Sequence, residues 1–376
     1  MKRIVVIFLL LALLPLRAVA LEVDGKSAVL MEVSTGKLLY EQEADVPLAP
    51  ASVTKVMTML LIMEAIDSGA ISWEDMVTAS EAAAAKGGSQ VYLKAGETMT
   101  VRDMLKSIAV SSANDCACAM AEHLAGSEAA FVERMNARAE ELGMENTHFV
   151  NCTGLDDGPE AAEHRTSARD IAIMSRELLL KHPKIKDFTT IWMDSIRGGS
   201  FGLSNTNKLV RFYNGATGLK TGFTTSAMYC LSASAQRDGM ELIAVVMGAP
   251  SSGARFSACK QLLDYGFAGY AVYAPTLPRE AEIPVRLGRE ATVRVRLQAE
   301  PILVEKGKRA AITTELELAQ ELRAPVEAGQ QIGSLKVMSG DQVLAQLPLV
   351  AEASVEKLSW GDMFLKLLSR AAMSGT

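Results

Sequence analysis

Residues 52–67 read SVTKVMTMLLIMEAID, and apolar side chains fall on nearly every side of a helix drawn through them. A helix that is apolar all round is buried, so the segment is predicted to cross the core of a domain. Its first turn nevertheless carries the hydroxyl of Ser52 and the amine of Lys55. Residues three apart on a helix share one face. The sequence therefore predicts that these two groups meet in a buried place.

The pair has the chemistry of an activated nucleophile. A serine hydroxyl reacts poorly near neutral pH and needs a base within hydrogen-bonding reach. Burial lowers the pKa of a lysine, so Lys55 can exist as a neutral amine, and a helix beginning at Ser52 would aim backbone N–H groups at developing negative charge. The pattern alone is weak evidence, because Ser-x-x-Lys also begins at Ser34, Ser257 and Ser354. Those three are predicted to be a turn, a solvated helix face and the start of a tail.

The surrounding chain predicts an α+β domain over residues 21–273. Residues 28–42 indicate a hairpin that turns at 34–36, and a mostly helical region continues to about residue 181. Residues 227–235 and 241–247 indicate two more strands, with a turn at 236–239. Helices that precede and follow an antiparallel sheet are typical of an α+β layer fold.

Two further motifs accompany the Ser52 pair. Ser112-Ala113-Asn114 interrupts two predicted helices, where a bend can aim side chains into a cleft. Thr100 and Asp103 indicate the cap of the first of these helices. The segment 220–222, Lys-Thr-Gly, opens a predicted strand, and its glycine would let a substrate backbone approach closely.

The three motifs together resemble those of class A β-lactamases and penicillin-binding proteins. The resemblance is closest to the low-molecular-mass penicillin-binding proteins, the serine-type D-alanyl-D-alanine carboxypeptidases. It extends over nearly all of residues 21–376, with supporting stretches at 146–149, 153–156, 166–170 and 262–267. It implies a transpeptidase-like domain with helices on both faces of an antiparallel sheet, a small C-terminal all-β domain and an amphipathic C-terminal helix.

By that resemblance, Ser52 attacks the carbonyl between two D-alanines at the end of a peptidoglycan stem peptide, and Lys55 takes its proton. Ser112 and Lys220 pass a proton to the leaving amine, and water then releases the acyl-enzyme. Penicillins and other β-lactams would acylate the same serine. This chemistry needs neither a metal nor a cofactor. The residues that the resemblance implies to contact substrate are Asn114, Lys220, Thr221, Gly222, Phe223 and Arg255.

Each of these binding residues has an expected role. Asn114 would hydrogen-bond the substrate amide, and the backbone N–H groups of Ser52 and Phe223 would form the oxyanion hole. Lys220, Thr221 and Arg255 would hold the terminal carboxylate, which suits the bidentate geometry of arginine. The chain departs from its relatives at Ala113, where they carry glycine or aspartate, and at Phe223, where many carry histidine. Both departures concern substrate preference and deacylation rather than the reacting groups.

Two other functions stay open at this point. A serine β-lactamase would use the same acylation, but it would not need the additional β domain or the tail. A non-catalytic cell-wall or β-lactam-binding module would not need the full set of reacting side chains. A Ser-His-Asp triad lacks support, because none of the four histidines lies in a recognisable nucleophile-elbow context.

The N-terminus indicates export. A cationic start at residues 1–3 precedes an apolar run at 4–16 and the small-x-small pattern at 18–20. This arrangement predicts a signal peptide over residues 1–20, with an uncleaved anchor as the alternative. The formal net charge of -6 and the lack of a basic run argue against nucleic acid as a partner. The five cysteines show no framework spacing and are predicted to be mostly buried thiols.

The C-terminal quarter is predicted to form two units. Residues 274–353 show alternating strands, in which Val293 and Val295 alternate with Arg294 and Arg296. Residues 354–376 contain an amphipathic helix expected from Val355 to about residue 373. Such a helix can lie in a membrane interface, or alternatively dock on protein. Together with the export signal, a helix bound to the membrane predicts that the protein lies on the outer face of the cytoplasmic membrane.

Overall fold

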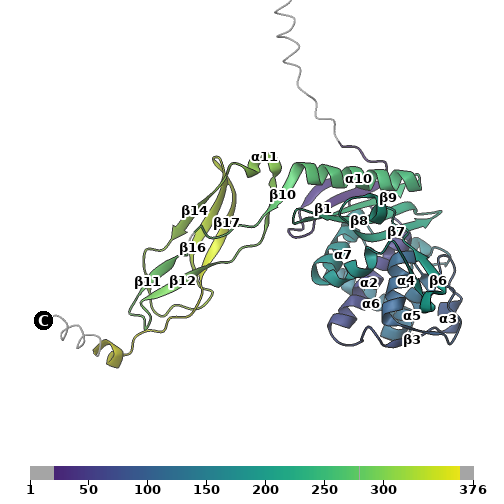
Figure 1. The fold of residues 1–376 in the computed structure, drawn as a ribbon, viewed down its shortest axis with the longest axis horizontal. Coiled ribbons are helices and arrows are strands. Elements are labelled where there is room, and N and C mark those ends of the chain that lie inside the picture. Colours follow the sequence, from purple (N-terminus) through teal and green to yellow (C-terminus); the bar gives the residue numbers. More distant parts are fainter. Residues whose placement is uncertain (1–20, 279, 365–376) are drawn as a thin grey trace, which may run out of the picture.

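The computed structural model describes residues 21–278 and 280–364 of the chain. Figure 1 shows two parts that are joined beside helix α10 (Ser252–Gly269). The larger part combines a sheet with helices, and the smaller part is an elongated array of strands. The predicted signal peptide, residues 1–20, lies outside the described residues.

Five strands form the sheet of the larger part in the order β2-β1-β9-β8-β7, and all neighbours pair antiparallel. Both predicted hairpins are confirmed, since β1 pairs with β2 and β8 pairs with β9. The strands are β1 (Ser27–Glu32), β2 (Leu38–Gln42), β7 (Ala216–Thr224), β8 (Met228–Arg237) and β9 (Met240–Ala249).

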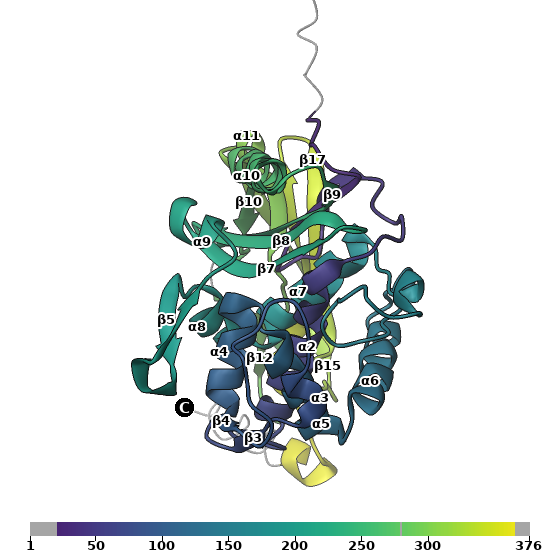
Figure 2. The same ribbon diagram turned by 90° about the vertical axis from the view of Figure 1, so that its right-hand side faces the viewer.

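Helices cover both faces of this sheet. Val29 and Met31 of β1 belong to one apolar cluster, whereas Leu30 belongs to a second cluster with Leu262 of α10. Successive side chains of a strand point to opposite faces, so β1 is buried along its whole length. Figure 2 shows α10 above the sheet, with α7 (Ala168–Lys181) and α2 (Lys55–Asp67) below it. The predicted α+β fold is confirmed.

The helical region lies below the sheet. The predicted cap at Thr100 is confirmed, since the Thr100 hydroxyl accepts the backbone N–H of Asp103 at 3.1 Å. Two small two-stranded sheets, β3–β4 and β5–β6, flank the helices. The remaining elements are η1 (Ala51–Thr54), β3 (Met76–Thr78), α3 (Glu81–Ala84), β4 (Thr98–Thr100), α4 (Val101–Ser111), α5 (Asn114–Ala125), α6 (Glu128–Glu141), η2 (Ala161–Glu163), η3 (Pro183–Ile185), α8 (Lys186–Thr189), β5 (Met193–Ile196), η4 (Arg197–Gly199), β6 (Phe201–Ser204) and α9 (Leu209–Phe212).

The smaller part is a six-stranded sheet with its own apolar cluster, in the order β14-β16-β17-β12-β11-β15. The predicted alternation is confirmed, because Val293 and Val295 are buried while Arg294 and Arg296 are exposed. A separate pair, β10 with β13, lies where the two parts meet. The strands are β10 (Tyr270–Tyr273), β11 (Glu282–Arg286), β12 (Thr292–Leu297), β13 (Ile302–Glu305), β14 (Ile312–Leu318), β15 (Leu322–Arg323), β16 (Gln331–Ser339) and β17 (Gln342–Ala351), with the turn α11 (Lys306–Arg309).

The tail departs from prediction at its start. Val355 and Lys357 form β-bridges with Val326 and Gly288, so they extend the β part instead of opening a helix. Helical structure begins only at Trp360, and residues 365–376 of the predicted amphipathic helix lie outside the described residues. None of the helices described within 21–278 and 280–364 is long and apolar enough to cross a bilayer.

Candidate active site

Ser52 lies in a tight turn instead of on the α-helix that was predicted to open there. Residues 51–54 form the 3₁₀ turn η1, and the α-helix begins at Lys55. Ala51 has a φ of 48°, which is uncommon for a residue with a side chain. The turn leaves Ser52 partly exposed while Val53 and Thr54 are buried. The serine is therefore presented to solvent from the start of a buried helix.

Lys55 faces Ser52 as predicted. Its Nζ lies 3.0 Å from Ser52 Oγ and 2.7 Å from the carbonyl oxygen of Thr153, and its side chain is fully buried. Both partners are neutral, so neither offsets the cost of burying an ammonium. Burial lowers the pKa of Lys55 to about 7. A substantial fraction of the amine is therefore uncharged near neutral pH and able to accept a proton.

The motif 112–114 forms the junction between α4 and α5. Ser112 ends α4 in the left-handed conformation, with a φ of 66°, and Asn114 is the first residue of α5. The Asn114 amide donates to Gly87 O at 2.7 Å, but its buried Oδ1 has no partner within the described residues. A buried acceptor without a partner is costly. The junction thus holds a fixed acceptor ready for an N–H donor.

Strand β7 supplies the third motif and packs against η1. Lys220 is buried, and its Nζ donates to Thr221 O at 2.8 Å. Burial, and then the charges of Lys55 and Arg255, hold the pKa of Lys220 well below its usual range. The Thr221 hydroxyl donates to Thr206 Oγ1 at 2.7 Å. The positive charge of Lys55 therefore disfavours the charged form of Lys220.

Position 222 must be a glycine because β7 passes very close to η1, the turn at residues 51–54 that carries Ser52 and is called the nucleophile turn. A Cβ atom there would lie 2.6 Å from Pro50 O and 3.1 Å from the backbone nitrogen of Ser52. The sequence predicted that this glycine admits a substrate backbone, but the closest neighbour is the protein's own turn. The absence of a side chain sets the narrow spacing between β7 and Ser52.

The last two predicted binding residues are Phe223, which follows Gly222 on β7, and Arg255, which lies on α10. Arg255 is buried beneath β7 and β8 and donates through one nitrogen to Gly222 O at 2.8 Å and to Cys230 O at 3.2 Å. Its guanidinium also lies over the rings of Tyr229 and Phe256. Phe223 is 53% exposed. Arg255 therefore connects β7 and β8 through its two hydrogen bonds, while the Phe223 side chain is exposed to solvent.

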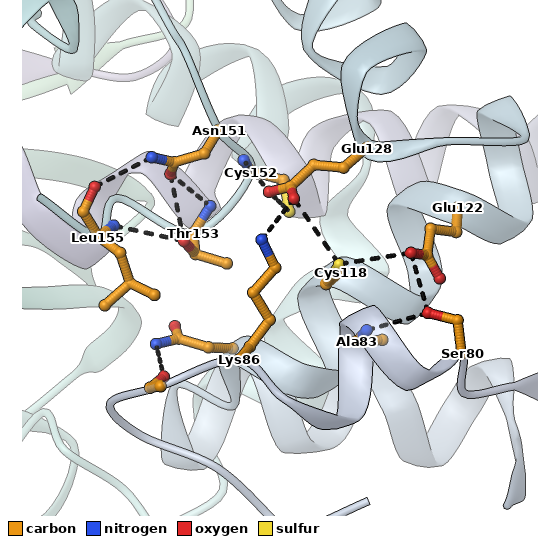
Figure 3. A network of polar contacts seen from close by, with 12 residues as sticks. Ser80, Ala83, Lys86, Cys118, Glu122, Glu128, Asn151, Cys152, Thr153 and Leu155 are labelled. Carbon is orange, nitrogen blue, oxygen red and sulfur yellow. Dashed lines mark hydrogen bonds and ion pairs between the residues drawn. The ribbon is translucent and has the colours of Figure 1, made fainter. Parts of the chain in front are cut away.

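A turn centred on Asn151 presents the acceptor for Lys55, a feature that sequence reasoning missed. Asn151 Oδ1 accepts the N–H groups of Thr153 at 3.1 Å and Gly154 at 2.7 Å, and its amide donates to Leu155 O at 3.0 Å (Figure 3). An asparagine that bonds to its own following backbone fixes a turn. This one aims the Thr153 carbonyl at Lys55.

Figure 3 also shows a polar cluster behind this turn. Glu128 pairs with Lys86 at 2.5 Å and accepts from the thiol of Cys152 at 3.2 Å and from that of Cys118 at 3.8 Å. All five cysteines are buried and free, which confirms the predicted buried thiols. A cavity of about 470 Å³ opens beside the cluster, with Lys86, Gly87 and Thr153 on its wall. The open space thus adjoins the acceptors that hold Asn114 and Lys55.

Comparison with known families identifies this arrangement. The family model for D-alanyl-D-alanine carboxypeptidases matches residues 15–251, and the model for the C-terminal domain of penicillin-binding protein 5 matches residues 276–357. The chain belongs to the D-alanyl-D-alanine carboxypeptidase family. In this carboxypeptidase, the predicted motifs therefore lie in the family's first domain, and the β part corresponds to its second.

Individual relatives agree with the family. The D-alanyl-D-alanine carboxypeptidase DacF of Bacillus subtilis is 43% identical over 343 residues, which cover 89% of this chain and 86% of that protein. Penicillin-binding protein 5 from Haemophilus influenzae has a similar structure, with a TM-score of 0.79 and 30% identity over 90% of this chain and 100% of that one. Penicillin-binding protein D2 from Listeria monocytogenes, solved with ampicillin bound, matches with a TM-score of 0.60 and 32% identity over 66% of this chain and 99% of that one.

Proposed function

We propose that this chain is a serine-type D-alanyl-D-alanine carboxypeptidase that forms its acyl-enzyme on Ser52. The observation that carries the proposal is the 3.0 Å contact between Ser52 Oγ and the buried Lys55 amine. While charged, the amine donates to Ser52 Oγ; once neutral, it can accept the hydroxyl proton. The family relationship supplies the substrate, a peptidoglycan stem peptide that ends in D-alanyl-D-alanine.

The proposed reaction has two halves. Ser52 Oγ bonds to the carbonyl carbon of the penultimate D-alanine as Lys55 takes its proton, and the backbone N–H groups of Ser52 and Phe223 stabilise the oxyanion. The peptide C–N bond then breaks, and the terminal D-alanine leaves with a proton passed through Ser112 and Lys220. Water next attacks the ester, which releases the shortened peptide and restores the Ser52 hydroxyl.

Substrate binding would use Asn114, Lys220, Thr221 and Arg255. Asn114 Oδ1, which has no partner among the described residues, would accept an amide N–H of the stem peptide. The terminal carboxylate would lie near Lys220 and Thr221, where its charge offsets the repulsion between Lys220 and its cationic neighbours. Arg255 would contribute to carboxylate binding through its charge, because its guanidinium already donates to two backbone carbonyls of the sheet.

Labelling with a penicillin tests this proposal. Mass spectrometry of the full chain should show one long-lived adduct on Ser52, and release of D-alanine from a stem pentapeptide should be lost in Ser52→Ala. Fast penicillin turnover would instead identify a β-lactamase. D-Alanine release that survives in Ser52→Ala would remove the basis for catalysis at this serine, and a lack of both labelling and release would indicate a non-catalytic binding module.

Export and membrane attachment are part of the proposal. The signal peptide expected at residues 1–20 would deliver the enzyme to the outer face of the cytoplasmic membrane. Trp360 and Phe364, at the start of the C-terminal tail, are 87% and 63% exposed. Exposed aromatic side chains on an amphipathic helix favour a membrane interface. The tail would thus hold the catalytic part near its peptidoglycan substrate.

A further inference from the structure

A chain of hydrogen bonds connects His164 to the peptide unit that precedes Ser52. The backbone N–H of Val150 donates to His164 Nδ1 at 3.0 Å, so that nitrogen carries no proton. The proton of the neutral ring is therefore on Nε2, which lies 2.7 Å from Thr54 Oγ1. The Thr54 hydroxyl accepts there and donates in turn to Ala51 O at 2.8 Å. Each bond in the series fixes the direction of the next.

The last acceptor in this series controls the nucleophile turn. Ala51 O and the N–H of Ser52 belong to one planar trans peptide, in which the oxygen and the hydrogen point in opposite directions. A carbonyl held toward Thr54 therefore turns the Ser52 N–H away from Thr54. Strand β7 passes close to the same peptide, since a Cβ atom at Gly222 would lie 3.1 Å from the Ser52 nitrogen. The Ser52 N–H is the donor that the proposed oxyanion hole requires.

The peptide unit needs this support for two reasons. Ala51 has a positive φ of 48°, a conformation that costs free energy unless its surroundings impose it. Gly154 also packs so closely that a Cβ atom there would lie 1.9 Å from Ala51 O. The carbonyl is thus enclosed between a glycine and a threonine hydroxyl. His164 and Thr54 are 4% and 0% exposed, so water does not compete for these bonds.

We propose that His164 is a positioning residue that, through Thr54, holds the Ala51–Ser52 peptide so that the Ser52 N–H points into the oxyanion hole. The inference rests on the proposed acylation of Ser52. It gives a role to a buried histidine that the proposed reaction does not otherwise use. His164 acts as a neutral donor, and its two neighbours in the series, Val150 and Thr54, dictate which ring nitrogen carries the proton.

Two substitutions at His164 separate the two ring nitrogens. In His164→Gln the amide reaches the position of Nε2 and can still donate to Thr54, whereas the shorter side chain of His164→Asn reaches only the position of Nδ1. We expect His164→Asn to lower the acylation rate constant for a fluorescent penicillin by about 10- to 100-fold. This loss is smaller than the loss expected when an oxyanion-hole donor is removed altogether. His164→Gln should stay much closer to wild type. Initial binding of the penicillin should change little in either variant.

Thr54 provides a second test that does not alter the histidine. Thr54→Val keeps the shape but removes the hydroxyl, so it should slow acylation as His164→Asn does, and Thr54→Ser should restore it. In the double variant Thr54→Val with His164→Asn, the loss should equal the larger single loss, because both break one series. Nitrogen NMR of the wild-type ring should show an unprotonated Nδ1 and a protonated Nε2.

The controls distinguish this inference from the proposed function. His123→Asn, on an exposed histidine of α5, should leave acylation unchanged. If wild type acylates on Ser52 while folded His164→Asn and Thr54→Val acylate equally fast, the positioning role is wrong even when both melt at lower temperature. If wild type forms no adduct on Ser52, the proposed function itself is wrong.

Discussion

The amine of Lys55 lies 3.0 Å from the hydroxyl of Ser52, with no charged partner among its hydrogen bonds. The pKa of this amine is lowered to about 7 by burial. The uncharged, proton-accepting fraction therefore grows as pH rises through 7. We expect the acylation rate by penicillin to rise with pH across an apparent pKa of about 7, measured by stopped-flow labelling. A profile that is flat from pH 5 to 9 would contradict the role of Lys55 as base.

Lys55→Met should abolish acylation and preserve the fold, since methionine fits a buried apolar site. The pKa of Lys55 is about 7 in the folded state and has the ordinary, higher lysine value in the unfolded chain. At pH values between the two, the unfolded chain binds more protons than the folded protein. The free energy of unfolding of wild type should therefore increase as pH rises through that window, and the increase should be smaller in Lys55→Met. Urea denaturation at several pH values measures the difference. Normal labelling of the folded variant would be incompatible with the mechanism.

Gly222→Ala should damage the site by steric contact alone. The added Cβ atom would lie 2.6 Å from Pro50 O, so β7 and the nucleophile turn must separate. We expect acylation to slow by about 100-fold or more, and unfolding to become easier by about 1–3 kcal/mol. Gly202→Ala in β6 is the matched control, because nothing lies within 4 Å of its Cβ position. Equal labelling rates in the two variants would show that the close approach is dispensable.

His164 should make the protein sensitive to acid. Burial, followed by the charges of His148 and Lys55, lowers the pKa of His164 to about 4. Between pH 4 and the ordinary histidine value, the unfolded chain binds more protons, so stability falls as pH falls, by at most about 1.4 kcal/mol per pH unit. In His164→Gln this contribution should disappear. Denaturation curves of both proteins at pH 7, 6 and 5 measure it, and parallel losses would argue that His164 is not buried as a neutral ring.

Removal of the tail should release the protein from membranes. The cut belongs after Leu358, because Val355 and Lys357 are still bridged to the β part. The truncated chain should acylate normally but stay in the supernatant after ultracentrifugation with anionic lipid vesicles. The double variant Trp360→Ala with Phe364→Ala should weaken pelleting, and Val343→Ala, at another exposed apolar side chain, should not. Unchanged pelleting of the truncated chain would favour a docked helix.

Much of the site could be predicted because its side chains contradict their local pattern. Lys55 is a charged residue in an apolar helix, and Lys220 is a charged residue in the buried middle of β7, which begins four residues earlier than predicted, at Ala216. The Thr153 carbonyl could not be found this way, because a backbone oxygen leaves no trace in residue type. Its contact with Lys55 spans 98 positions and depends on the turn at Asn151.

The wrong prediction for the tail and the missed role of His164 also arise from contacts between distant parts of the chain. The tail was expected to be helical from Val355 because its local pattern is amphipathic, but bridges to Val326 and Gly288 override that preference. His164 was considered only as one of four histidines that a Ser-His-Asp triad could use, and its positioning role was not predicted. Its role depends on Val150 and Thr54, which come to it from different parts of the fold.

The pairing of β10 with β13 determines where the catalytic part can be cut free. β10 continues directly from α10, yet its partner strand lies beyond residue 300, and Lys306 donates to Phe267 O at 2.5 Å across the same junction. A fragment that stops at Tyr273 would keep β10 with an open edge, which invites self-association. A fragment that ends at Gly269 would omit that strand altogether. The few residues between these two endpoints should decide whether an isolated catalytic fragment remains monomeric at the concentrations used for crystallisation.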